Sequence, residues 1–309
     1  MSDEIPMGPG AEFDAIRQML ERWGPRAVGI GDDAAVMHVA RGDSLVVSVD
    51  TFVEGRHFLR GWLTPREIGF RAVAAALSDI AAMAARPTGV LIALNLPEYW
   101  NESLIEIADG IGEMVDLAQT CIRGGNLSDG TELSVTTTVL GEAFAPLARR
   151  GARAGDRVYV TGRFGGPGAA TALLYAGESA GDFRDRFARP VPRLAEAVWL
   201  AERGASAAID VSDGLLADVG HLAVASGVDI SMDATRVPLM DGVEIDAALR
   251  SGEEYELVVT SSELDVAAFE RRFAIPLTEI GHVTDSRDGC VHVSGARVAN
   301  VRGYDHLSR

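Results

Sequence analysis

The alternation of apolar and polar residues predicts helices along most of the chain. Residues 64–86 carry the clearest helical pattern, in which Thr64 is the N-cap, Glu67 completes a capping box and the helix ends before Pro87. A helix over residues 101–120 is expected to begin at Asn101. Further helices are expected over residues 11–23, 167–176, 191–203, 241–250 and 262–273.

Runs of β-branched residues and period-two alternation predict strands between these helices. The stretch "SLVVSVDTFVEG" predicts a strand that ends at Asp50 and Thr51. The stretch "AIDVSDGLLADVGHL" predicts an apolar strand that runs into an apolar helix. Other strands are expected over residues 89–97, 132–143, 157–162, 228–234, 254–260, 277–283 and 290–295.

The predicted elements divide into two groups. A segment rich in Ala, Arg, Gly and Pro, residues 144–156, separates two α/β stretches, and 309 residues suffice for two domains of ordinary size. We therefore place the domains at residues 1–146 and 147–309. Because helices and strands alternate irregularly, the fold class is predicted to be mixed α+β in both halves.

Composition narrows the classes of partner and the compartment. The formal net charge of −17 argues against nucleic acid, whose binding depends on clustered Lys and Arg. Cys121 and Cys290 lie far apart without CxxC partners, which excludes a disulfide framework and a thiolate zinc site and fits a reducing compartment. The acidic N-terminus does not resemble a signal peptide, and apolar runs are too short to cross a bilayer. We expect a cytoplasmic protein that binds neither membranes nor nucleic acid.

Two glycine-rich stretches resemble phosphate-binding motifs but lack their chemistry. In "GIGDDA" the variable positions of a dinucleotide fingerprint are Asp32 and Asp33, which would repel a pyrophosphate unless a metal intervened. The stretch "TGRFGGPGAAT" lacks the Gly-Lys-Ser/Thr end of a P-loop, so a structural turn is favoured there.

Five aspartates stand in or beside apolar segments: Asp33, Asp50, Asp79, Asp210 and Asp213. A buried carboxylate is costly unless it is paired, and hard divalent cations with oxygen ligands, Mg²⁺ above all, are suitable partners. Each aspartate taken alone also fits a helix cap or a turn. All five together favour a magnesium site that handles a phosphorylated ligand.

The motifs "GIGDDAAV", "VVSVDTFVEGRHF", "ALSDIAAM", "RGGNLSDG", "ARRGARAGDRVYVTG", "AIDVSDGLLADVGH", "SGEEYEL" and "GYDHL" resemble, in order and spacing, the thiamine-monophosphate kinase family. The resemblance implies the two-domain fold of aminoimidazole ribonucleotide synthetase, with an N-terminal α/β domain that binds ATP and Mg²⁺ and dimerises, and a C-terminal α+β domain. It also implies ATP-dependent phosphorylation of thiamine monophosphate to thiamine diphosphate by in-line transfer. Several Mg²⁺ ions and ATP are required, with K⁺ as a further candidate, and the protein is expected to be a homodimer.

The resemblance assigns roles to individual residues. The metal ligands it implies are Asp33, Ser48, Val49 (through its backbone oxygen), Asp50, Asp79, Asn126, Asp210 and Asp213. Among these, Asp50, Asp79, Asp210 and Asp213 are the implied catalytic residues. ATP would contact Gly125, Asn126, Arg149 and Ser212, and thiamine monophosphate would contact His57, Glu253 and Tyr304.

Four of these assignments have bland alternatives. His57 also fits a packed surface histidine, and Arg149 a solvated linker residue. Glu253 also fits a solvated pair with Glu254, and Tyr304 an anchor for the C-terminal tail. His221 and His282 are interpreted as structural.

Three positions depart from the family pattern. Asn126 stands where the family usually has aspartate, which predicts weaker binding of one metal ion, and Asp129 stands where arginine is usual. Ser251 replaces a glycine, which places an extra side chain close to the implied substrate position. Two alternatives therefore stay open: another member of the superfamily with a different substrate, and a non-catalytic nucleotide-binding relative. A selenophosphate synthetase is disfavoured because the N-terminal segment has no cysteine.

Overall fold

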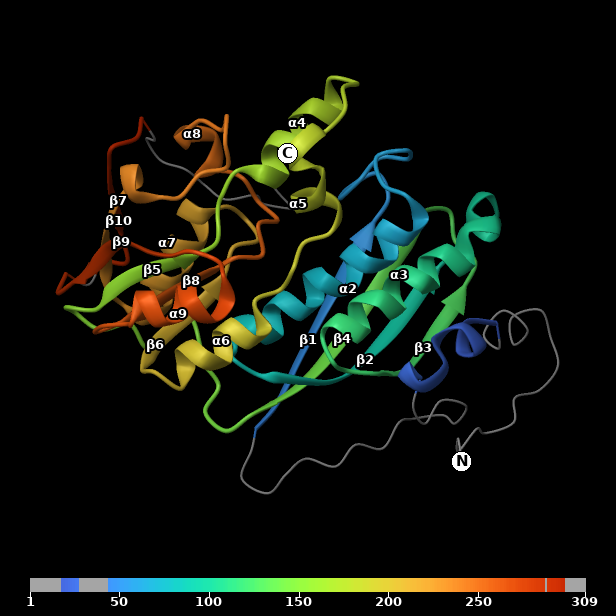
Figure 1. Ribbon diagram of the computed structural model, residues 1–309, viewed down its shortest axis with the longest axis horizontal. Helices are drawn as coiled ribbons and strands as arrows, with labels where there is room; N and C mark the ends of the chain where they lie inside the picture. The colour runs from blue at the N-terminus through green and yellow to red at the C-terminus, as the bar shows by residue number, and fades with distance from the viewer. Residues whose placement is uncertain (1–17, 28–43, 287, 298–309) are drawn as a thin grey trace. The chain divides into compact units, whose positions relative to one another are not determined.

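A computed structural model describes residues 18–27, 44–286 and 288–297 (Figure 1). The chain forms two compact units. The first comprises residues 1–80 and 86–145, and the second comprises residues 81–85 and 146–309. No helix in the described ranges is long and apolar enough to cross a membrane.

The first unit is built on a four-stranded sheet in the order β1-β4-β2-β3. Strands β1 and β2 run antiparallel to β4, and β3 runs parallel to β2. The described elements of this unit are η1 (Gly24–Arg26), β1 (Ser44–Val53), α2 (Pro65–Ala82), β2 (Arg86–Asn95), η2 (Glu98–Ser103), α3 (Leu104–Leu117), β3 (Ile122–Ser128) and β4 (Ser134–Ala143).

Helices α2 and α3 lie side by side along the sheet (Figure 1). Their backbones approach closely because glycines stand at the crossing: a Cβ at Gly69 would meet the Ile107 carbonyl, and one at Gly110 would meet the Arg66 carbonyl. Helix α2 begins as predicted, since the Thr64 N–H donates to the Glu67 carboxylate at 2.7 Å and the Glu67 N–H donates to the Thr64 hydroxyl at 3.2 Å.

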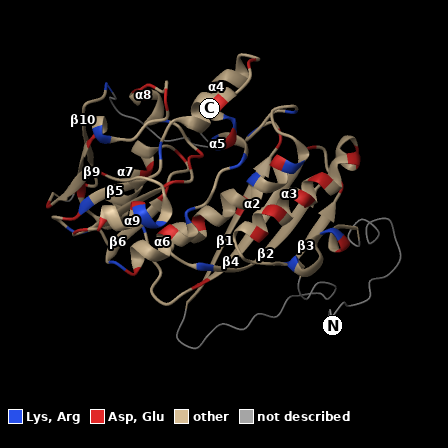
Figure 2. Ribbon diagram, in the orientation of Figure 1, with Lys and Arg blue, Asp and Glu red and all other residues tan. Residues whose placement is uncertain are grey.

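Acidic residues follow the exposed surface of α3 (Figure 2). Three of them pair with arginines of the same unit: Asp109 with Arg22, Glu113 with Arg66 and Asp116 with Arg26. Solvent screens ion pairs at the surface, so these pairs contribute little to stability. Two of the pairs connect Arg22 and Arg26 near the N-terminus to α3, and the third connects α2 to α3.

The second unit contains a six-stranded sheet in the order β10-β7-β9-β5-β8-β6. All neighbouring strands run antiparallel except the edge pair β10 and β7, which is parallel. Its described elements are β5 (Arg157–Thr161), α4 (Gly166–Tyr175), η3 (Gly181–Phe183), α5 (Arg184–Ala188), α6 (Leu194–Ala201), β6 (Ala205–Asp210), α7 (Leu215–Ser226), β7 (Asp229–Asp233), η4 (Ala234–Arg236), α8 (Ile245–Ala248), β8 (Leu257–Ser261), α9 (Val266–Phe273), β9 (Leu277–Thr284) and β10 (Val291–Ser294).

Apolar side chains cover both faces of this sheet. One core joins α7 to inward residues such as Val160 and Ile209. The other joins α6 and α9 to residues such as Tyr159 and Val259. Successive strand residues point to opposite faces, so a central strand such as β8 is buried along its whole length.

Three predicted boundaries are wrong. Strand β1 continues beyond Asp50 to Val53, because β4 pairs with it as far as Ser134. Helix α3 does not begin at Asn101; a 3-10 turn occupies this position and the α-helix starts at Leu104. The predicted strand over residues 254–260 begins only at Leu257, since residues 251–256 have no regular secondary structure and Glu253 and Tyr255 have positive φ values.

Candidate active site

The first unit brings together two of the predicted metal ligands, which lie on different elements. Ser48 lies in β1 and Asp79 in α2, and the Ser48 hydroxyl donates a hydrogen bond to the Asp79 carboxylate at 2.5 Å. Both side chains are half-buried. The contact arises because Ser48 is on the face of β1 that turns toward the helices, as is the buried Phe52 four residues later.

Asp50 lies between Ser48 and Phe52 on the same face of β1, and it is exposed. Its carboxylate accepts the N–H of Thr51 at 2.8 Å. Val49 points the other way and is 61% exposed, which fits the prediction that only its backbone oxygen serves as a ligand. This part of the chain therefore presents a hydroxyl and two carboxylates on one side of the sheet.

Gly125 and Asn126 lie on β3, at the opposite edge of the same sheet, and both are exposed. They pair with Ile92 and Ala93 of β2. A Cβ at Gly125 would meet the backbone of Ile92, so the strand can approach its neighbour only with glycine here.

His57 follows β1 in a short loop and is half-buried. Its Nδ1 accepts the N–H of Val53 at 3.0 Å, and its ring lies 5.3 Å from that of Phe52. The Nδ1 hydrogen bond fixes the orientation of the ring.

In the second unit, Asp210, Ser212 and Asp213 occupy the turn between β6 and α7. Asp210 is buried, whereas Ser212 and Asp213 are half-buried. The N–H groups of Asp213 and Gly214 both donate to the Asp218 carboxylate, each at 3.1 Å. Asp218 therefore holds the turn from the first turn of α7.

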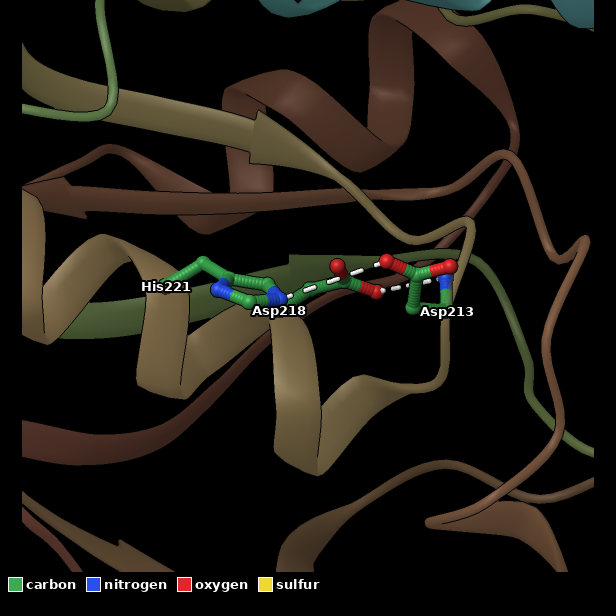
Figure 3. A group of neighbouring side chains, drawn as sticks. All are labelled: Asp213, Asp218 and His221. Carbon is green, nitrogen blue, oxygen red and sulfur yellow. Dashed lines mark hydrogen bonds and ion pairs between the residues drawn. The ribbon is translucent and has the colours of Figure 1, made fainter. Parts of the chain in front are cut away.

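The carboxyl of Asp218 is buried beside two other acids. Burial, followed by the charges of Asp210 and Asp213, raises its pKa to about 8. Asp218 and His221 join Asp213 in a group whose ligand atoms all lie within 4.8 Å of one another (Figure 3). His221 is exposed, and its Nε2 lies 4.0 Å from an Asp213 oxygen.

Asp218 and His221 were not among the predicted site residues, and His221 was interpreted as structural. The sequence signal was present: Asp213, Asp218 and His221 follow one another at spacings of five and three, which a helix that starts after Asp213 brings to one side. The two carboxylates suit Mg²⁺, whereas imidazole is a ligand that transition metals such as Zn²⁺ prefer.

Glu253 lies in the irregular segment that precedes β8, and this segment contacts the Ser212 backbone. Its N–H donates to the Ser212 carbonyl at 2.7 Å, and the Tyr255 N–H donates to the Val211 carbonyl at 2.9 Å. The predicted substrate residue Glu253 and the predicted nucleotide residue Ser212 are thus direct neighbours. The predicted ATP ligand Arg149 is exposed, and its carbonyl accepts the Ser226 hydroxyl. Asp33 and Tyr304 lie outside the described residues.

Comparisons with known proteins cover most of the chain. Residues 31–143 match the family described as AIR synthase related protein, N-terminal domain, and residues 153–294 match the corresponding C-terminal domain. The thiamine-monophosphate kinase of Escherichia coli (strain K12) is 34% identical, over 91% of this chain and 92% of the relative. The chain belongs to the thiamine-monophosphate kinase family. The predicted family and the predicted enzyme class are confirmed.

Solved structures of thiamine-monophosphate kinases have the same fold. The crystal structure from Stenotrophomonas maltophilia K279a is 34% identical and superposes with a TM-score of 0.83, over 93% of this chain and 98% of the other. The structure of AaThiL complexed with AMPPCP and TMP is 30% identical, with a TM-score of 0.78 over 99% and 100% of the two chains. The predicted mixed two-domain fold is therefore confirmed.

Proposed function

We propose that this chain transfers the γ-phosphoryl group of ATP to thiamine monophosphate, yielding ADP and thiamine diphosphate. The bond from the γ-phosphorus to the β–γ bridging oxygen breaks, and a bond to a phosphate oxygen of thiamine monophosphate forms. Membership of the thiamine-monophosphate kinase family supports the reaction. The observation that carries the proposal is the group of Asp213, Asp218 and His221 next to Asp210, because polyphosphate transfer requires divalent cations.

Each unit carries its own set of oxygen ligands that fits Mg²⁺. In the first unit these are Ser48, Asp50 and Asp79, with Asp33 and the Val49 carbonyl as further predicted ligands. The predicted ligand Asn126 lies on the opposite edge strand of the sheet and does not join this group. In the second they are Asp210, Asp213 and Asp218. The fit rests on the donor chemistry and on the raised pKa of Asp218, a carboxyl whose charge a cation would favour. When bound, Mg²⁺ would neutralise phosphate charge and align the phosphates.

The residues of this chain perform binding and alignment. The acceptor is a phosphate oxygen that is already ionised at neutral pH, so a general base is not required. The two substrates repel each other, and catalysis consists of holding them in line. We assign Arg149, Gly125, Asn126 and Ser212 to ATP, and His57, Glu253 and Tyr304 to thiamine monophosphate.

We assign dimerisation and one set of ATP and Mg²⁺ residues to the N-terminal domain, residues 1–146. The C-terminal α+β domain, residues 147–309, contributes Arg149, Ser212 and the second set of carboxylates. Dimerisation is supported by the outer face of β1. Leu45, Val47 and Val49 are 48%, 53% and 61% exposed and form one apolar row on an edge strand. Exposed apolar rows of this kind mark contact surfaces. Cytoplasmic location stays a prediction.

The test is to incubate the purified protein with ATP, Mg²⁺ and either thiamine monophosphate or thiamine, with and without K⁺. Thiamine diphosphate from the monophosphate alone is the expected result. ATP binding without turnover of either compound would overturn the proposal. It would favour a non-catalytic nucleotide-binding protein and direct attention to Asn126, whose lack of charge weakens one metal site.

A further inference from the structure

A network of charged residues, three of them buried and Arg186 half-buried, lies beside the segment that carries Glu253. Glu254 and Glu256 are 1% and 0% exposed, and the guanidinium groups of Arg186 and Arg193 pair with them. Buried charges are costly to desolvate, so a network of this kind is retained for geometry more readily than for stability.

Glu256 is held from two sides. Its carboxylate accepts two hydrogen bonds from Arg193, at 2.6 and 2.5 Å, and one from the Thr161 hydroxyl at 2.7 Å. Burial alone would raise the pKa of Glu256, but the attraction of Arg193, with Arg186 and Thr161, brings it below its ordinary value. A Cβ at Gly162 would clash with this carboxylate, so glycine at this position makes room for the Glu256 side chain.

Arg186, in α5, connects both carboxylates to the backbone of the segment that carries Glu253. One guanidinium nitrogen lies 2.9 Å from Glu256, and the other lies 3.3 Å from the Glu254 carboxylate and donates to the Glu254 carbonyl at 3.1 Å. The other carboxylate oxygen of Glu254 accepts a hydrogen bond at 2.5 Å from the N–H of Gly165, the N-cap of α4. Lysine could supply a charge at this point but not a planar fork that reaches three oxygens.

The backbone on either side of Glu254 is in the left-handed region, which residues with side chains rarely adopt. Glu253 and Tyr255, on either side of Glu254, have φ values of 58° and 53°. Such conformations persist where surrounding contacts hold them. Here the contacts are the Ser212 and Val211 carbonyls on one side and the Glu254–Arg186 pair on the other.

We propose that Arg186 is a positioning residue. It acts through Glu254 to hold the left-handed backbone conformation that presents Glu253 to thiamine monophosphate. The inference rests on the proposed function, in which Glu253 contacts that substrate. Because Glu253 also donates to Ser212, the same network sets the backbone that leads into Asp213. The role of the network is to place Glu253, the residue assigned to the acceptor substrate.

The test compares Arg186→Lys with Arg157→Lys. Arg157 pairs with Glu279 on the exposed surface of the same unit, so its replacement controls for the loss of an arginine pair. Glu254→Gln is the second variant: it keeps an oxygen for the Gly165 N–H but removes the charge that faces Arg186. It carries the test if Arg186→Lys fails to fold.

We expect Arg186→Lys to raise KM for thiamine monophosphate roughly tenfold or more. KM for ATP should rise by less, because the network reaches the predicted ATP residue Ser212 through a backbone hydrogen bond from Glu253. Glu254→Gln should change the same constant in the same direction, and Arg157→Lys should change neither. Equal increases in both KM values would indicate general loosening and overturn the inference, as would wild-type values in folded Arg186→Lys.

Hydrogen exchange separates this inference from the proposed function. In Arg186→Lys the amides of Glu253 and Tyr255 should exchange about tenfold faster or more, while those of β8 keep wild-type protection. If the wild-type protein converts no thiamine monophosphate, the proposed function fails, and exchange still reports on the network. Unchanged exchange at both amides would overturn the positioning role whatever the activity.

Discussion

The Ser251 hydroxyl accepts a hydrogen bond from the Gly168 N–H, 3.0 Å away. Ser251 is only 4% exposed, and it stands where the family pattern has glycine. The hydroxyl thus satisfies one of the N–H groups that the first turn of α4 leaves without a helical partner. The sequence predicted that the Ser251 side chain lies close to the substrate position. In the structure its hydroxyl bonds to the N-terminal end of α4.

Replacing Ser251 by alanine should therefore weaken the fold of the second unit. A hydrogen bond contributes about 0.5–1.5 kcal/mol net, and Gly168 is only half-buried, so we expect a loss of up to this size in the free energy of unfolding measured with urea. Ser262→Ala, which removes an exposed serine hydroxyl of the same unit, is the matched control. Stability equal to that of the wild type in Ser251→Ala would contradict the assigned hydrogen bond.

Asp50→Ala should abolish formation of thiamine diphosphate while leaving the fold intact. Asp50 is exposed on β1, so its removal creates no cavity, but it removes a proposed metal ligand. We expect kcat to fall at least about a hundredfold, the scale typical of lost electrostatic stabilisation. Circular dichroism and thermal unfolding check the fold, and Glu106→Gln, an exposed acid of α3, controls for loss of charge. Full activity would rule out Asp50 as a ligand.

Asp218→Asn should stabilise the metal-free protein at neutral pH. The Asp218 pKa of about 8 lies above its ordinary 3.8, so unfolding releases a proton and wild-type stability falls as pH rises from about 4 to about 8. Asparagine keeps an oxygen for the Asp213 and Gly214 N–H groups and does not ionise.

Urea unfolding between pH 5 and pH 8 measures this difference. The midpoint of Asp218→Asn should exceed that of the wild type by an amount that grows with pH, and added Mg²⁺ should narrow the gap. Asp182→Asn, an exposed acid of the same unit, should show no such trend. A gap that shrinks with rising pH would have the wrong sign for a carboxyl whose pKa is raised.

Asp229 shows the opposite behaviour at the edge of the sheet. Its carboxylate accepts the N–H groups of Cys290 and Asp288 at 3.0 and 2.9 Å and lies 3.2 Å from His292. The backbone hydrogen bond from Cys290, the largest cause, with those from Ser286, His292 and Asp288, lowers its pKa to about 2. The stabilisation is complete above about pH 4 and is lost as pH falls from about 4 to about 2.

Asp229→Asn should therefore loosen β10 at neutral pH but differ little from the wild type below about pH 2. Amide exchange of residues 291–294, corrected for the intrinsic rate at each pH, measures the effect. Asp265→Asn, an N-cap of α9 distant in sequence from β10, is the control. Wild-type protection of β10 that rises on acidification would refute this account.

The elements with local chemistry could be predicted from the sequence. The capping box of Thr64 and Glu67 is self-contained, so the start of α2 follows from four residues. The end of β1 could not be predicted from Asp50, because pairing with β4 decides it. Asn101 has the chemistry of an N-cap, but the 3-10 turn takes precedence at that position.

Parts of the candidate site depend on contacts between distant segments. Ser48 and Asp79 are 31 residues apart, and the alternation of β1 gives only the face on which Ser48 lies. The pairing of Arg186 with Glu254, 68 residues apart, has no local sequence signal. Asp218 and His221 did have such a signal, because they are three residues apart on one helix. Their approach to Asp213 depends on where α7 begins.

The apolar row of Leu45, Val47 and Val49 predicts the oligomeric state. Because a chain with a net charge of −17 repels its copies, a dimer requires an apolar contact that outweighs the repulsion. We expect light scattering of the wild type to give about twice the 32.7 kDa of the chain, and Val47→Glu to give the monomer mass. Tyr175→Glu, an equally exposed apolar position in the other unit, should leave the dimer intact. A dimer that survives Val47→Glu unchanged would locate the interface elsewhere, because two carboxylates facing each other across an apolar contact cannot be desolvated cheaply.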